Sequence, residues 1–275
     1  MFQFANAHAL AEKHNTVFFL DLSGFESYPL RRFELNTVFG INNSASDSLL
    51  ANEGISKTSL LRRVAAKLAG KKTITRFKET SFLYDETVFQ LPLPLYLEGY
   101  WQSEKYFIDS QDSLRAYFSF NSPLSNSNQR YAEQISACPA VSLHIRRGDY
   151  ATDAKTNTVH GLLPLDYYRR AVEFVTEKNG QSHFFVFSDD IAWAKEHLSF
   201  IEKVTFIDNI DKAPDWQEMC LMSLCKHNIV ANSSFSWWGA WLNNNNDKLI
   251  IAPNKWFNDT SIDTRDLIPS SWIRL

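Results

Sequence analysis

Two arginines follow directly on an apolar run in the middle of the chain, and their charged side chains could bind an anionic group. The run is AVSLHI (140–145), and Arg146, Arg147 and Asp149 follow it. A guanidinium stays charged at any working pH, and its planar fork of donors matches phosphate oxygens. Along a strand, His144 and Arg146 share a face while Arg147 points the other way. One arginine can therefore meet an anionic ligand while its neighbour pairs with a carboxylate; the alternative is an internal Arg–Asp network that stiffens the loop.

Two further polar clusters also follow apolar runs. Ser188 and Asp189, near the end of HFFVFSDD (183–190), can hold the ribose or base of a nucleotide, or can cap the helix expected next. The other cluster opens a helix, where free backbone N–H groups and small hydroxyls suit a phosphate. It consists of Asn232, Ser233, Ser234, Phe235 and Ser236. The tryptophans just after it are expected to pack in the core.

The elements around these clusters alternate regularly from residue 138 onward. Strands are predicted at 140–145, 183–190, 203–208, 228–232 and 248–253, and helices at 164–178, 191–198, 214–227 and 235–243. Residues 146–157 are expected to form a polar loop. Strands that alternate with helices of about ten to fifteen residues indicate a parallel α/β sheet. Ligands of such sheets lie outside the carboxyl ends of the strands, where all three clusters fall.

The first half of the chain is less regular. It opens with a predicted helix over 2–14, followed by a strand over 16–22 and, later, an amphipathic helix over 59–70. The aromatic-rich segment 95–107 is expected to lead into a helix that ends near Phe120. A loop rich in Asn and Ser, 121–129, is the expected domain boundary.

Composition narrows the class of protein. The chain has 275 residues, a net charge of −3 and a pI of about 6.2, so no general field attracts nucleic acid. No signal peptide and no apolar run of about 18 residues is visible, which predicts a cytoplasmic protein without a membrane span, leaving open a peripheral association through a partner. Cys138, Cys220 and Cys225 are expected to be reduced thiols, the last two packed in the core.

Several segments together resemble glycosyltransferase family 11, the α-1,2-fucosyltransferases. HIRRGDY (144–150) resembles the H-x-R-R-x-D motif that α-1,2-, α-1,6- and protein O-fucosyltransferases share, and NIVANSSFSWWGAWL (228–242) resembles family 11 itself. RRFELN (31–36), GYWQSEKYF (99–107) and FVFSDD also look like blocks of that family, in its order. The resemblance covers nearly the whole chain.

This resemblance implies a GT-B fold of two Rossmann-like domains with parallel sheets, an acceptor-side domain over 1–130 and a GDP-fucose-binding domain over 131–275. It implies inverting transfer of L-fucose from GDP-fucose to the 2-hydroxyl of a terminal β-galactoside on a glycan, with no metal and no cofactor. Surface polysaccharide assembly is the usual setting of the family.

The same resemblance gives expected roles to the site residues. Arg146, His144 and Asp149 are the expected catalytic residues: Arg146 would bind the β-phosphate, His144 would contact the nucleotide and Asp149 would hold the loop. Arg147 is expected to bind the donor as well. Ser188, Asp189 and the turn formed by Asn232, Ser233, Ser234, Phe235 and Ser236 would complete the donor pocket. A fixed guanidinium and helix-start N–H groups can neutralise a departing diphosphate without a metal.

The catalytic base and the N-terminus carry the open alternatives. Asp153 is a candidate base, although a loop carboxylate is usually only solvated, and His160 suits a turn better than a catalytic role. Family members begin with a strand and a loop resembling G-G-L-G-N-Q before M-F-Q, whereas this chain begins at Met1-Phe2-Gln3. The expectation is a missing first strand in the N-terminal domain. The alternatives are fucosyl transfer at another linkage and a non-catalytic nucleotide-sugar or glycan-binding remnant.

Overall fold

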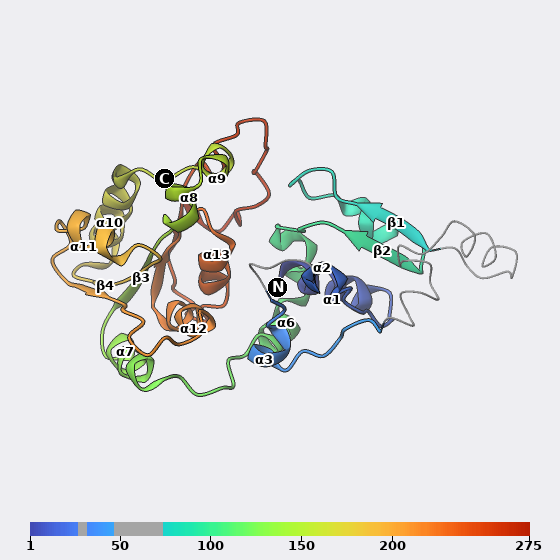
Figure 1. Ribbon diagram of the computed structural model, residues 1–275, viewed down its shortest axis with the longest axis horizontal. Coiled ribbons are helices and arrows are strands. Elements are labelled where there is room, and N and C mark those ends of the chain that lie inside the picture. Colours follow the sequence, from blue (N-terminus) through green and yellow to red (C-terminus); the bar gives the residue numbers. More distant parts are fainter. Residues whose placement is uncertain (27–31, 47–73) are drawn as a thin grey trace, which may run out of the picture. The chain divides into compact units, whose positions relative to one another are not determined.

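The structure is a computed structural model that describes residues 1–26, 32–46 and 74–275. The chain forms two compact units, drawn in Figure 1. The first comprises Met1–Asn121 with Arg265–Leu267, and the second comprises Ser122–Thr264 with Ile268–Leu275. The units meet in sequence between Asn121 and Ser122, within the loop expected as the boundary. The helix predicted over 59–70 lies outside the described residues.

The second unit is built on a six-stranded parallel sheet with the order β5-β4-β3-β6-β7-β8. The strands are β3 (Ala140–Ile145), β4 (His183–Ser188), β5 (Val204–Phe206), β6 (His227–Ile229), β7 (Ile250–Ala252) and β8 (Ile273–Arg274). Every pair in this sheet is parallel. The predicted α/β class with parallel sheets is confirmed, and β8 is a strand that the sequence did not predict.

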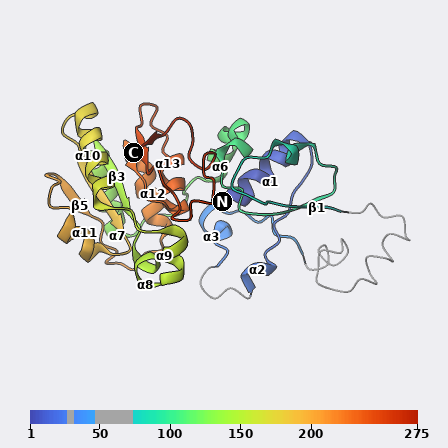
Figure 2. The same cartoon turned by 90° about the horizontal axis from the view of Figure 1, so that it is seen from above.

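Helices cover both faces of this sheet because β3 and β4 are apolar on both. Figures 1 and 2 both show β3 between α10 (Leu165–Asn179) and α12 (Trp216–Leu224). Val141 and Leu143 pack in one cluster with residues of α10, whereas Phe185 packs in another with residues of α12. Burial of a side chain such as Phe185 contributes roughly 1.5–3 kcal/mol. The result is a rigid sheet whose strand ends are fixed in position.

The strand order reverses at β3. The chain runs outward through β4 and β5 on one side of β3 and then returns to place β6 and β7 on the other. In open parallel sheets the crevice for a ligand forms outside the carboxyl ends of the strands at such a switch point. The arginines that follow β3 and the Asn232 turn that follows β6 both lie at this place.

Two segments of the second unit that were predicted as loops are partly helical. Residues 146–157 contain α8 (Gly148–Thr152) and the start of α9 (Ala154–His160), because Asp153 accepts a hydrogen bond from the backbone N–H of Lys155 and caps α9. In the boundary loop, α7 (Asn126–Ser136) begins where Ser125 caps it. The loop predictions were wrong there. Two other helices of the second unit form close to their predicted positions. They are α11 (Ile191–His197) and α13 (Ser234–Trp241).

The described residues of the first unit contain one two-stranded parallel sheet, formed by β1 (Thr75–Lys78) and β2 (Leu95–Glu98). The helix predicted at the start of the chain is α1 (Phe2–Lys13). The other helices are α2 (Ser23–Glu26), α3 (Leu35–Phe39), α6 (Gln111–Tyr117) and the short 3-10 turns η1 (Glu86–Gln90), η2 (Glu104–Tyr106) and η3 (Ile108–Ser110). α6 ends close to the predicted position near Phe120.

The strand predicted over 16–22 does not form. Leu20 makes only an isolated parallel bridge to Ser44, while Val17 and Phe19 are exposed. A strand needs a partner along its length, and this segment finds one at a single residue. The two strands that form in the first unit, β1 and β2, were not predicted as strands.

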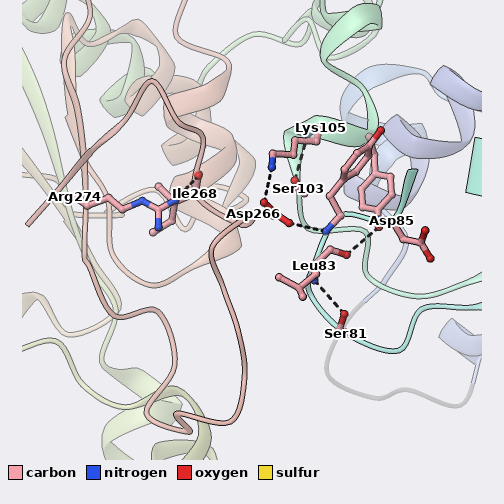
Figure 3. A network of polar contacts seen from close by, with 10 residues as sticks. Ser81, Leu83, Asp85, Ser103, Lys105, Asp266, Ile268 and Arg274 are labelled. Carbon is pink, nitrogen blue, oxygen red and sulfur yellow. Dashed lines mark hydrogen bonds and ion pairs between the residues drawn. The ribbon is translucent and has the colours of Figure 1, made fainter. Parts of the chain in front are cut away.

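A short segment near the C-terminus belongs to the first unit. Asp266 pairs with the Lys105 ammonium at 2.5 Å (Figure 3). It also accepts the backbone N–H of Tyr84 at 2.9 Å. These hydrogen bonds lower the pKa of Asp266 against the opposing effect of burial, which is the largest single influence. Two residues further on, Ile268 is already part of the second unit, where its carbonyl accepts a bond from Arg274 at 2.8 Å.

No helix among the residues that the structure describes is long and apolar enough to cross a membrane. The thiols lie as expected, with Cys220 and Cys225 buried and Cys138 partly exposed, and all three are free.

Candidate active site

The Arg146 side chain lies at the carboxyl end of β3 and is held by two carboxylates. Its guanidinium contacts Asp149 at 2.5 Å and Asp189 at 2.7 Å. Its cationic carbon lies 5.3 Å from the centroid of the Tyr150 ring. About a quarter of the side chain remains accessible, at 23%. The predicted pairing of an arginine with Asp149 is present, and the structure adds Asp189 from the neighbouring strand.

Arg147 has different partners from Arg146, as the sequence predicts for these neighbouring arginines. Its Nε donates to Asp190 at 3.1 Å and its guanidinium lies 4.1 Å from the Trp193 ring centroid. Its backbone N–H donates to Asp189 at 2.8 Å. Arg147 therefore anchors the loop to α11, and Arg146 is the arginine whose charge acts on His144.

Asp189 organises the junction between β3 and β4. One oxygen accepts the Arg147 N–H and the other pairs with Arg146. A Cβ atom at Gly148 would lie 2.6 Å from this carboxylate, so only glycine allows the loop to approach so closely. Ser188 has a different role, because its hydroxyl accepts the N–H of Asp190 at 3.0 Å.

The helix cap expected after β4 is also present. Asp190 accepts the backbone N–H of Trp193 at 3.2 Å and so caps α11. Of the two roles considered for this cluster, helix capping falls to Asp190. Asp189 is instead paired with Arg146, and the nucleotide-binding role stays a prediction.

His144 is buried beneath the arginine loop. Its side chain is 6% exposed in relative terms, and its Nδ1 is buried without a hydrogen-bond partner. Burial lowers the pKa of His144 to about 4; the Asp189 charge opposes this effect and the Arg146 charge adds to it. The imidazole is therefore neutral at pH 7. Its ring lies 5.9 Å from that of Phe235, so these two predicted donor residues are brought together.

The turn after β6 combines a structural residue with a helix start. Asn232 is buried, and its side-chain NH₂ donates to the carbonyls of His160, Gly161 and Trp256 at 2.9, 3.2 and 3.1 Å. Its side-chain oxygen is buried without a partner. Asn232 thus ties the end of α9 to the end of β6.

The serines of this turn form the first turn of α13. Ser233 caps the helix by accepting the Phe235 N–H at 3.3 Å, and Ser236 donates back to the Ser233 carbonyl at 3.3 Å. Ser234 is the first helical residue. The positive end of the α13 dipole, equivalent to roughly half an elementary charge, therefore lies at this turn. Behind it, Trp237, Trp238 and Trp241 are buried as predicted.

The two other candidates have mainly structural contacts. Asp153 accepts bonds from the Lys155 N–H at 3.0 Å and the Thr156 hydroxyl at 2.8 Å, and these hydrogen bonds lower its pKa. A lowered pKa makes a carboxylate a weaker base. His160 ends α9, and its ring stacks on Tyr150 with centroids 4.8 Å apart.

One titratable group beside the site was not singled out from the sequence. Glu218 lies in the first turn of α12 and is partly buried. Burial raises its pKa to about 7, and the charges of Asp215 and Asp189 raise it further. The segment 214–227 was interpreted only as an apolar helix, and periodicity alone does not indicate that a carboxyl near its start faces inward. Its interaction with Asp189 places Glu218 near the arginine cluster.

Within the described ranges, no group of three or more His, Cys, Asp or Glu side chains is arranged to hold a metal ion. The cationic groups of this site are the two arginines and the start of α13.

Comparison with known proteins places the chain in a family. An alpha-1,2-colitosyltransferase from Escherichia coli is 32% identical over all of this chain and 94% of its own length. An O-antigen biosynthesis glycosyltransferase, WbnK, from the same species is 33% identical over all of this chain and 96% of its length. The human galactoside alpha-(1,2)-fucosyltransferase 1 is 25% identical over 54% of this chain and 43% of its own length. The profile of glycosyl transferase family 11 matches residues 62–275. The chain therefore belongs to glycosyl transferase family 11.

Proposed function

We propose that this glycosyltransferase moves L-fucose from GDP-fucose to the 2-hydroxyl of a terminal β-galactoside, with inversion and without a metal. The observation that carries the proposal is Arg146, a partly accessible guanidinium held by Asp149 and Asp189 at the switch point of the sheet. The colitosyl- and fucosyltransferase relatives are both named for α-1,2 transfer, which supports the linkage.

The chemistry of the reaction explains why such a guanidinium is needed. Breaking the bond between fucose and phosphate leaves positive charge on the sugar ring and negative charge on the departing diphosphate. A guanidinium that is already oriented stabilises the diphosphate without reorganising during the reaction. Arg146 meets this requirement because two carboxylates fix its plane before the donor arrives.

The start of α13 supplies the second stabilising element. Its first turn, at Ser234 and Ser236, follows directly on β6, and the positive end of a helix dipole favours an anion there. The neutral His144 imidazole and the Phe235 ring lie together under the arginine loop, where they suit the nucleoside part of the donor. In this proposal Asp153 is a helix cap and not the base.

A second donor has a specific observation in its favour. The colitosyltransferase relative aligns over the whole chain, whereas the human fucosyltransferase aligns over about half of it. Colitose is fucose without its 3-hydroxyl, so the two GDP-sugars share the diphosphate and the ring configuration. The second candidate is therefore α-1,2 transfer of colitose through the same residues.

Parallel assays with the two donors test both candidates. The enzyme is incubated with lactose and either GDP-fucose or GDP-colitose, with and without EDTA, and the products are identified by mass spectrometry. We expect fucosyllactose at a rate that EDTA leaves unchanged. Product from GDP-colitose alone would replace fucose by colitose. Measurable GDP binding with no product from either donor would favour the binding remnant, and a large loss of rate with EDTA would contradict metal independence.

A further inference from the structure

An aromatic pair in the first unit, with one ring exposed and the other partly buried, is not used by the donor site. Tyr100 is 64% exposed, and its ring stacks on that of Phe82 with centroids 6.0 Å apart and planes 18° from parallel. The two residues, hereafter the aromatic platform, come from different loops. Because the Tyr100 ring is exposed, it presents a flat apolar face to solvent.

The backbone on the Tyr100 side is clamped by one carboxylate. Glu79 accepts the backbone N–H of Tyr100 at 2.6 Å and that of Trp101 at 3.1 and 3.2 Å. A Cβ atom at Gly99 would lie 2.5 Å from the Glu79 Cβ, so the loop passes this side chain as closely as glycine allows. Gln3 adds a bond to the Gly99 carbonyl at 2.9 Å.

Trp101 holds the same loop in an unfavourable backbone conformation. Its φ angle is +59°, which is uncommon for a large side chain, and the indole is 2% exposed. Such strain persists only where the surroundings enforce it, and it concentrates at ligand-binding sites. The buried indole and the Glu79 clamp enforce it here, and the residue that they direct outward is Tyr100.

The loop that carries Phe82 is fixed as well. Figure 3 shows the Leu83 N–H directed at the Ser81 hydroxyl, at 3.3 Å. The Tyr106 hydroxyl donates to the Leu83 carbonyl at 3.3 Å and accepts the Asp85 N–H at 3.0 Å. Both sides of Phe82 are therefore restrained by hydrogen bonds.

Tyr106 joins the two loops to each other. Its ring meets that of Trp101 edge to face, with centroids 5.3 Å apart and planes at 88°. The next residue after Leu83, Tyr84, donates its N–H to Asp266 at 2.9 Å. The aromatic platform is thus held in place without any ligand, so little conformational entropy is lost when one binds.

We propose that the aromatic platform binds the terminal galactose ring of the acceptor glycan, with Tyr100 as the residue that the sugar covers. This inference rests on the proposed function, which requires a galactoside acceptor. In β-galactose the axial 4-hydroxyl leaves the hydrogens of C3, C4 and C5 together on one face of the ring. That face is apolar and flat, and it matches the face of an aromatic ring, while the tyrosine hydroxyl lies at the polar edge.

The size of the platform favours a sugar over a protein. One ring pair buries at most a few hundred Å². Stable protein interfaces bury about 1,200–2,000 Å² in total. A single pyranose covers one aromatic ring. Glucosides are expected to bind less well, because their equatorial 4-hydroxyl places the hydrogens of C3 and C4 on opposite faces.

The test compares Tyr100→Ala and Tyr100→Phe with the matched control Phe19→Ala, which removes another exposed aromatic ring of the same unit, 52% exposed. Transfer from GDP-fucose is measured against lactose concentration and, separately, against donor concentration. Tyr100→Ala is expected to raise the KM for lactose about tenfold, as for the loss of one aromatic contact, with the KM for GDP-fucose unchanged. Tyr100→Phe and Phe19→Ala should stay within about twofold of wild type on the same scale.

A binding measurement separates failure of this inference from failure of the proposed function. Saturation-transfer NMR with methyl β-galactoside, and with methyl β-glucoside as control, needs no transfer reaction. Wild type should saturate H3, H4 and H5 of the galactoside, and Tyr100→Ala should lose this effect.

Absence of saturation in wild type, or an unchanged KM for lactose and an unchanged saturation pattern in Tyr100→Ala, would overturn the inference. A change in oligomeric state in Tyr100→Ala by light scattering would instead identify the platform as an interface and overturn it too. Binding to the platform without transfer by wild type would overturn the proposed function alone.

Discussion

Arg146 combines two properties that a charge-stabilising residue needs, a fixed plane and partial access to solvent. We predict that Arg146→Ala lowers kcat about 10²–10³-fold, the usual loss when one such group is removed. The matched control is Arg170→Ala, which removes an exposed arginine paired with Asp166 at 2.8 Å. Steady-state transfer rates check this, with thermal unfolding to confirm the fold. An Arg146→Ala enzyme within a few-fold of wild type would remove Arg146 from the mechanism.

Glu218 gives a prediction on pH. Its folded pKa, about 7, lies above the ordinary value of 4.5 for a glutamate, so between these values the folded state holds more protons than the unfolded state. The contribution of Glu218 to stability therefore falls as pH rises through this window and is lowest above pH 7. Glu218→Gln removes the ionisation, and at pH 8 it should raise the free energy of unfolding by up to about 3 kcal/mol.

The measurement for Glu218 is the difference in urea unfolding between the variant and wild type from pH 4.5 to 8. A difference is needed because His144 acts in the opposite direction. Its folded pKa of about 4 lies below 6.5, so its contribution is lost as pH falls through that range. A difference that does not grow with pH would contradict the buried state of Glu218.

At the scale of elements, Asn232 joins β6 to the end of α9. Asn232→Asp would place a carboxylate against three carbonyl oxygens, those of His160, Gly161 and Trp256. We expect a loss of about 3 kcal/mol or more in the free energy of unfolding, because a buried charge is left without a donor. Asn246→Asp, on the exposed loop before β7, is the control and should change it by less than about 0.5 kcal/mol. Equal urea midpoints for the two variants would refute the role of Asn232.

Substitution of Asp153 tests whether this residue acts as a helix cap or as the catalytic base. We predict that Asp153→Ala leaves kcat within about twofold of wild type, since its lowered pKa suits capping rather than proton abstraction. A small decrease in melting temperature is expected from loss of the α9 cap. Asp153→Asn is the companion variant, because it retains an acceptor for the cap. A large loss of kcat in both variants, with the fold intact, would establish Asp153 as the base.

The elements show where sequence patterns are informative. β3 was predicted at its observed limits, 140–145, because a continuous apolar run buried on both faces has few alternatives. The segment after it was predicted as a loop, since its polar composition hid two short helices, of which Asp153 caps the second. Residues 16–22 contain an apolar run, but only Leu20 pairs with another segment. A strand forms only where a neighbouring strand pairs along its length.

The site follows the same pattern. Arg146, Asp149 and His144 could be found because they are adjacent in sequence at a strand end. The ion pair between Arg146 and Asp189 follows from the pairing of β3 with β4, which places the two strand ends side by side. Glu218 could not be found, because only the packing of α12 determines that its carboxyl is desolvated enough to raise its pKa.

At the scale of the molecule, the two units have different tasks in this account. The second carries the arginine loop, the buried His144 and the start of α13, which together suit a nucleotide diphosphate. The first carries the aromatic platform, which suits a sugar ring.

The most direct test of the central claim is the structure of the product formed from GDP-fucose and lactose. Two-dimensional NMR of the purified trisaccharide identifies the atom to which the new sugar is attached and its anomeric configuration. We predict a correlation between H1 of an α-fucose and C2 of the galactose. Attachment at any other galactose carbon, or no trisaccharide from an enzyme that binds GDP, would contradict the assignment.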